Sequence, residues 1–111
     1  MSPTNQILLG NLTIDMDSFD VRVGPRSVYL NRLEFDLLKF FAANRGKIIE
    51  VPVITKHLWH QRGITSAGNL RIHIYRLRKK LDGSKPWQIK NVPTRGYGLI
   101  EVPGEIKSRA S

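Results

Sequence analysis

The feature that most constrains the fold of this chain is an apolar stripe near its middle. Leu70, Ile74, Leu77 and Leu81 follow one another at intervals of four, three and four residues. Because an α-helix turns by about 100° per residue, these intervals place all four side chains along one narrow line. We therefore predict a helix over about 67–81 that packs on a core with this face only.

The opposite face of the predicted helix is polar and basic, with one apolar exception. Ile72 lies one helical turn from Arg76. Arginine can form paired hydrogen bonds with guanine, and isoleucine can contact a thymine methyl group. A solvated basic helix with a single exposed isoleucine is the alternative, since such residues are common. We favour a helix that reads bases in a DNA major groove. Its predicted base readers are Asn69, Arg71, Ile72 and Arg76, and its predicted backbone contacts include Tyr75, Lys79 and Lys80.

Charge is distributed unevenly along the chain. Residues 1–50 hold six basic and six acidic residues, whereas residues 51–111 hold twelve basic and three acidic ones. The second part therefore carries the whole formal net charge of +9. A local excess of this size is typical of a face that binds a polyanion such as nucleic acid. A basic half that only aids solubility is the alternative.

Two shorter helices are predicted before the basic one. Asn31 and Glu34 have the spacing of a capping box, with asparagine in place of the usual serine or threonine. The first helix is expected over about 32–44, and the second over about 52–60, because Pro52 suits a first helical turn. A loop is expected at 60–66. The predicted core residues of the two helices are Leu33, Phe35, Leu37, Phe40, Phe41, Val53, Ile54, Leu58 and Trp59.

The ends of the chain have strand patterns. Short apolar runs at 6–9, 12–16, 19–23 and 27–30, separated by turn-forming residues, predict a four-stranded antiparallel sheet over about 6–30. Ile48 and Ile49 are compatible with one more short strand. Two further strands over about 87–102 form a hairpin, and 103–111 are expected to be a flexible tail. The sequence thus predicts one α+β domain over 1–102, with a sheet, three helices and a closing hairpin.

The predicted hairpin adds a second basic element. Lys90 lies on it, and Thr94 and Arg95 lie at its turn. An arginine at such a tip can enter a minor groove, where a narrow groove concentrates negative potential. An ordinary solvated turn residue is the other interpretation.

Several other classes of protein fit poorly. The chain has no cysteine, which excludes a disulfide framework, cysteine zinc ligands and a thiol nucleophile. No apolar run approaches the roughly 20 residues of a membrane span, so we expect a soluble, cytoplasmic protein without a membrane partner. His57 and His60 are three residues apart, but no carboxylate cluster supports a metal site. We find neither a Gly-x-Ser-x-Gly elbow nor a phosphate-binding glycine motif, and we expect no enzyme, cofactor or metal.

Five motifs in order resemble the effector domain of OmpR/PhoB-type response regulators, over roughly residues 7–102. Residues 30–38 read L-N-R-L-E-F-D-L-L, like the family's L-T-x-x-E-F-x-L-L. Residues 44–49 resemble N-x-G-x-V-V, and Leu58-Trp59 resembles V-W. Residues 73–81 read H-I-Y-R-L-R-K-K-L and match H-I-x-x-L-R-K-K-L almost completely. Residues 96–99 are similar to the closing G-Y-R-L.

The resemblance implies a winged helix-turn-helix domain of a bacterial two-component system that regulates transcription. Arg76 would be a main base reader and Ile72 an apolar base contact. His73 and Arg78 would hold phosphates, and Trp59 would pack near the backbone. The loop at 60–66 would contact RNA polymerase, and two copies would bind tandem half-sites about one helical turn apart. A protein-interaction module with the same fold is the main alternative; binding to RNA or an anionic membrane is weaker.

Three positions depart from the family pattern. Arg71 stands where an acidic residue is usual, and Gly68 stands where a polar or basic residue usually opens the helix. Pro93 occupies the position of the usual wing arginine, and Arg95 lies two residues further toward the tip. The target DNA sequence therefore does not follow from relatives, and the resemblance gives no support for minor-groove contact by the wing.

Overall fold

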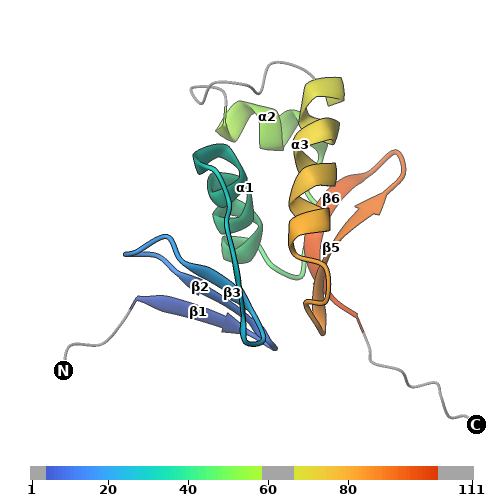
Figure 1. The fold of residues 1–111 in the computed structure, drawn as a ribbon. Coiled ribbons are helices and arrows are strands. Elements are labelled where there is room, and N and C mark those ends of the chain that lie inside the picture. The colour runs from blue at the N-terminus through green and yellow to red at the C-terminus, as the bar shows by residue number, and fades with distance from the viewer. Residues whose placement is uncertain (1–4, 59–66, 103–111) are drawn as a thin grey trace, which may run out of the picture.

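The computed structural model describes residues 5–58 and 67–102, and it confirms the predicted α+β winged-helix architecture (Figure 1). A four-stranded sheet lies at one side, three helices follow, and a hairpin closes the domain beside the third helix. The elements are β1 (Gln6–Leu9), β2 (Leu12–Asp15), β3 (Val21–Val23), β4 (Arg26–Val28), α1 (Arg32–Ala43), α2 (Val51–His57), α3 (Ala67–Lys80), β5 (Trp87–Val92) and β6 (Gly96–Glu101).

The N-terminal sheet is antiparallel, in the order β1-β2-β3-β4. Leu12 pairs with Val23 and Val21 with Val28, and these side chains are buried on one face, as the alternation of apolar residues requires. Strand β1 has the predicted bounds, whereas β2, β3 and β4 are shorter than predicted. Phe19, which we expected in a strand, lies in the turn before β3 with a φ of 65° and is 56% exposed, so its prediction as a strand residue was wrong.

Helix α1 begins with the predicted capping box. The Glu34 amide donates to Asn31 Oδ1 at 2.8 Å, and the Asn31 amide donates to Glu34 Oε1 at 3.0 Å. Leu37 and Phe41 are buried as expected, but Leu33 and Phe40 are only partly covered. The inner face is instead completed by residues that the narrower predicted stripe had left out, because α1 is enclosed by the sheet, α3 and the hairpin. These residues are Leu38 and Ala42, and Phe35 is buried as predicted.

Helix α2 is shorter than predicted. Ile54 and Leu58 are buried as expected, since residues four apart share one side of a helix. Val53 is 50% exposed, so its prediction as a core residue was wrong; it belongs to the outer side of this short helix. Trp59, also predicted as a core residue, lies outside the described residues.

The hairpin of β5 and β6 is joined to the helices by residues 46–49. The predicted short strand at 48–49 is a single bridge, in which the Ile49 amide donates to the Tyr97 carbonyl at 2.7 Å and the Tyr97 amide donates back at 3.1 Å. The two chains approach closely: a Cβ on Gly98 would lie 2.1 Å from the Lys47 carbonyl oxygen. Only glycine permits this contact.

The inner stripe of α3 lies in the common core, as predicted. Leu70, Ile74 and Leu77 are buried, together with Leu81 just beyond the helix. They belong to one cluster with buried residues of the N-terminal sheet, α1, α2 and the hairpin. The opposite face of α3 is thereby left outside the core.

Candidate nucleic-acid interface

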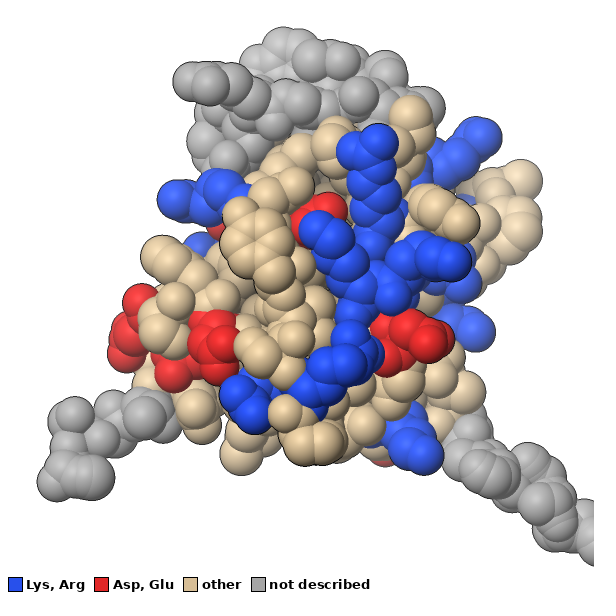
Figure 2. Space-filling model, in the orientation of Figure 1, with Lys and Arg blue, Asp and Glu red and all other residues tan. Residues whose placement is uncertain are grey.

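The outer face of α3 exposes large side chains that the core does not need. Ile72 is 49% exposed and Tyr75 is 59% exposed, and Arg76 and Lys79 are exposed beside them. Lys and Arg side chains run along this helix in the space-filling view (Figure 2). Burial of the inner stripe forces this outcome, because residues two and five positions after Leu70 must point away from it.

One flank of α3 faces the hairpin across a groove. Arg71 lines this groove at the start of α3, and Arg95 lines it from the hairpin tip. Arg71 was predicted on the base-reading face, and the helical period gave no sign that it shares a groove with Arg95. The other lining residues come from the start of α2 and from the hairpin: Glu50, Val51, Pro52, Asn91, Val92, Pro93, Thr94, Gly96 and Tyr97.

A second, separate groove lies along the later turns of α3. Tyr75, Arg78 and Lys79 line it from the helix, and Gln88 and Ile89 line it from β5. The Lys79 ammonium lies 5.8 Å from the centre of the Tyr75 ring, which is within the range of a cation–π contact. The two grooves thus give the hairpin side of α3 a set of exposed cations with an aromatic residue among them.

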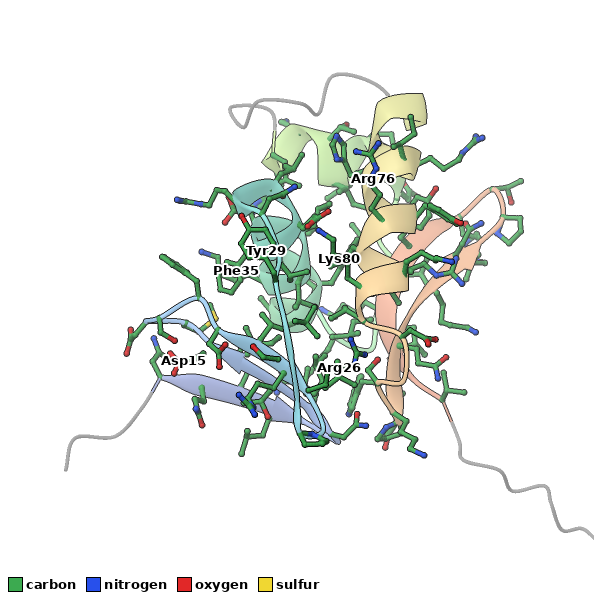
Figure 3. All side chains as sticks on the ribbon, viewed as in Figure 1. Asp15, Arg26, Tyr29, Phe35, Arg76 and Lys80 are labelled. Atoms are coloured by element: carbon green, nitrogen blue, oxygen red, sulfur yellow. The ribbon has the colours of Figure 1, made fainter. Side chains whose placement is uncertain are left out.

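The other flank of α3 faces α1. The Lys80 ammonium lies 2.6 Å from Glu34 Oε1, and Figure 3 shows Lys80 reaching from α3 in that direction. It also lies 5.6 Å from the centre of the Tyr29 ring. Glu34 is only 1% exposed, so Lys80 neutralises a buried carboxylate in addition to any role at the surface.

His73 is half-buried on the same flank. Its Nδ1 is buried, and no hydrogen-bond partner for it lies among the described residues. Only the rest of its ring is therefore available to a ligand. Asn69 belongs to α3, but its side chain lies outside the described part of the structure, as do Trp59 and the loop at 60–66.

The hairpin presents the three predicted wing residues to solvent, Lys90 from within β5 and the other two from the tip. Lys90, Thr94 and Arg95 are exposed, and Thr94 has a φ of 65° in the turn. The Arg95 amide donates to the Val92 carbonyl at 2.9 Å and closes this turn. The Arg95 side chain is thus carried at the end of a hydrogen-bonded hairpin.

Within residues 5–58 and 67–102 we find no group of three or more His, Cys, Asp or Glu residues able to hold a metal ion. The helices described there are too short or too polar to cross a membrane.

The fold and the basic outer helix define a winged-helix DNA-binding domain of the OmpR/PhoB type. Residues 25–99 match the family described as "Transcriptional regulatory protein, C terminal", and the chain belongs to this family. The resemblance seen in the sequence motifs is thereby confirmed.

Similar proteins are bacterial regulators. The chain is 33% identical to the transcriptional regulatory protein VxrB of Vibrio cholerae over 95 residues, which are 86% of this chain and 38% of that protein. It is 34% identical to the response regulator MprA of a Mycobacterium species over 94 residues, covering 84% of this chain and 41% of MprA. The chain therefore spans about two fifths of the length of these relatives.

Solved structures of similar fold include DNA-binding domains. The Klebsiella pneumoniae RstA DNA-binding domain, solved in complex with the RstA box, has a TM-score of 0.71 and 33% identity, and the match covers 87% of this chain and 98% of that one. The DNA-binding domain of Escherichia coli CadC has a TM-score of 0.74 and 28% identity, with 91% and 96% covered.

Proposed function

We propose that this chain binds double-stranded DNA at specific sequences and thereby regulates transcription. In this proposal α3 enters a major groove, and the β5–β6 hairpin lies at the adjacent backbone or minor groove. The observation that carries it is the exposure of Ile72 and Arg76 on a helix whose inner stripe is fully buried. The RstA domain, which was solved on its DNA box and which this chain covers almost completely, supports it.

The proposed roles follow from position on α3. Arg76 reads a base by paired hydrogen bonds, Ile72 gives an apolar base contact, and Asn69 is a further base reader. Arg71 is assigned to the edge of the base-reading surface, because it lines the groove that faces the hairpin. The proposed backbone contacts are His73, Tyr75, Arg78, Lys79, Lys80 and Trp59, and those of the wing are Lys90, Thr94 and Arg95.

The direct experiment is the selection of bound sites from random duplex DNA, with the Arg76→Ala variant alongside. We expect enrichment of a defined sequence, and a loss of about 1–3 kcal/mol for Arg76→Ala on that sequence with a much smaller loss on random DNA. Arg45→Ala is the matched control, because this exposed arginine lies after α1 and donates to the Ala42 carbonyl. Equal losses on both DNAs would reduce Arg76 to a phosphate contact.

The alternative is a protein-interaction module. Backbone binding by cations releases counterions, so the logarithm of the affinity should fall with the logarithm of salt concentration. The absence of an enriched sequence together with a flat salt response would favour this alternative.

Two partners are proposed from the family resemblance. RNA polymerase would contact the loop at 60–66, and two copies would bind tandem half-sites about one helical turn apart. A footprint that covers a single half-site at saturating protein would contradict the second proposal.

A further inference from the structure

The connection between α3 and the hairpin is short and fixes how the two elements are oriented. We call residues 81–86 the junction. Its first turn continues the helix, since the Leu81 amide donates to the Leu77 carbonyl at 3.0 Å. The buried Ser84 hydroxyl then donates to the Trp87 carbonyl at 2.8 Å, where β5 begins. A change in the path of the junction would therefore tilt the hairpin relative to α3.

The turn between β1 and β2 holds the junction by three hydrogen bonds. The Asn11 amide donates to the Lys85 carbonyl at 3.0 Å, and the Lys85 amide donates to Asn11 Oδ1 at 2.7 Å. The Asn11 side-chain nitrogen donates to the Gly83 carbonyl at 3.0 Å. The contact is close, because a Cβ on Gly10 would lie 2.2 Å from the Lys85 carbonyl oxygen.

The first residue of β4 holds the start of the junction. The Arg26 guanidinium donates to the Asp82 carbonyl and, at 3.5 Å, to the Lys80 carbonyl. These carbonyls lie at the C-terminal end of α3, where helical partners are missing and the helix dipole favours a cation. Figure 3 shows Arg26 between the sheet and the end of α3.

We propose that Asn11 and Arg26 form a clamp through which the N-terminal sheet sets the angle between α3 and the hairpin. The proposal rests on the proposed DNA binding, in which the two elements must meet adjacent grooves at once. The clamp acts on backbone groups of the junction, whereas α3 and the hairpin are otherwise held by core side chains and by the backbone bridge between Ile49 and Tyr97. Asn11 and Arg26 are thus positioning residues, which act on DNA recognition through α3 and the hairpin.

The test uses Asn11→Ala and Arg26→Ala, with Arg22→Ala as the matched control. Arg22 is exposed on the neighbouring strand β3, and its guanidinium contacts only Pro25 and Asp20 among the described residues. Asn11→Ala leaves the charge unchanged. Affinity is measured for the selected site and for random DNA, after thermal unfolding has shown that each variant is folded.

We expect both clamp variants to lower the ratio of specific to random affinity by about three- to tenfold, the range of one or two net hydrogen bonds. Arg22→Ala should leave this ratio unchanged. Arg26→Lys, which keeps the charge but lacks the forked donor, should behave like Arg26→Ala. An equal loss on both DNAs for Arg26→Ala, restored by Arg26→Lys, would identify a direct phosphate contact and overturn the proposal for Arg26.

A second measurement is independent of DNA. Because the chain has no cysteine, spin labels can be placed uniquely at Ile72→Cys on the outer face of α3 and Lys90→Cys on β5. We expect a broader or shifted distance distribution in the clamp variants and an unchanged one in Arg22→Ala. An unchanged distribution in the clamp variants would overturn the inference even if DNA binds. If no DNA site is enriched, the proposed function fails, and this measurement still decides whether the clamp exists.

Discussion

The N-terminal part of the molecule (residues 1–50) and the part that contains α3 and the hairpin (residues 51–111) differ in how their charged side chains are balanced and paired. In the first, acids and bases are equal in number, and Arg32 pairs with Asp36 at 3.2 Å. In the second, no carboxylate of the described residues lies within ion-pair distance of Arg71, Arg76 or Arg78. Several charges of the first part are paired, within it or with Lys80 of α3, whereas these three arginines have no carboxylate partner among the described residues, as the proposed binding of a polyanion requires.

The largest expected effect tests whether the two parts share one core. Leu77→Ala on α3 and Leu12→Ala on β2 should each lower the free energy of unfolding by about 2–5 kcal/mol, because both side chains are fully buried in one cluster. Leu8→Ala, at an exposed leucine of β1, should change it by less than about 0.5 kcal/mol. Chemical denaturation measures all three, and two separate unfolding transitions would show that the parts are independent units.

The next largest effect concerns Lys80 of α3, which forms an ion pair with Glu34 of α1. Lys80→Ala removes the partner of the buried Glu34 carboxylate and should destabilise the fold by about 1–3 kcal/mol. The cost stays below that of a fully buried pair because the Lys80 side chain is 36% exposed. Lys79→Ala, one residue away and exposed, should leave thermal stability nearly unchanged. Similar stability losses for Lys80→Ala and Lys79→Ala would show that the ion pair with Glu34 does not stabilise the fold.

A smaller effect sharpens the contrast in DNA binding. If Arg78 neutralises one phosphate, Arg78→Ala should lower the slope of log affinity against log salt by about 0.9. Arg45→Ala, with the same loss of charge in the neutral part, should leave the slope unchanged. Titrations at several salt concentrations measure both slopes. Equal slopes for the two variants would contradict the proposal that cations of α3, and not those of the N-terminal part, contact phosphates.

The smallest effect lies in the turn between β2 and β3. The amides of Ser18 and Asp17 donate to the Asp15 carboxylate and hold its pKa below the ordinary value. Asp15 therefore adds stability above the pKa of the unfolded chain, and this contribution disappears as pH falls through the lowered folded-state pKa. Asp15→Asn should be slightly less stable than the wild type near neutral pH, and the difference in melting temperature should vanish in acid.

The elements that could be predicted from the sequence are those that bury one side, because burial of one side produces a regular spacing of apolar residues. The α3 stripe, the Asn31 capping box and the four strands followed from local spacing, and the structure confirms them. Val53 and Phe19 were misplaced because a short helix and a tight turn leave apolar residues outside, which no local pattern reveals. The contacts of Asn11 and Arg26 join positions more than fifty residues apart. They depend on how the sheet packs, so local spacing carried no signal for them. For Arg71, the helical period predicted which side of α3 the residue occupies. It did not predict that the hairpin faces that side.

The Glu34 carboxylate connects two helix ends, which affects both the unfolding of the domain and the substitutions that it tolerates. Its Oε1 accepts from both the Asn31 amide and the Lys80 ammonium, so a single oxygen serves the beginning of α1 and the end of α3. Because the Glu34 carboxylate is buried, loss of either donor would leave it less well satisfied, so we expect the stability of the two helix ends to be linked. Evolution should accordingly replace Glu34 and Lys80 together rather than one at a time.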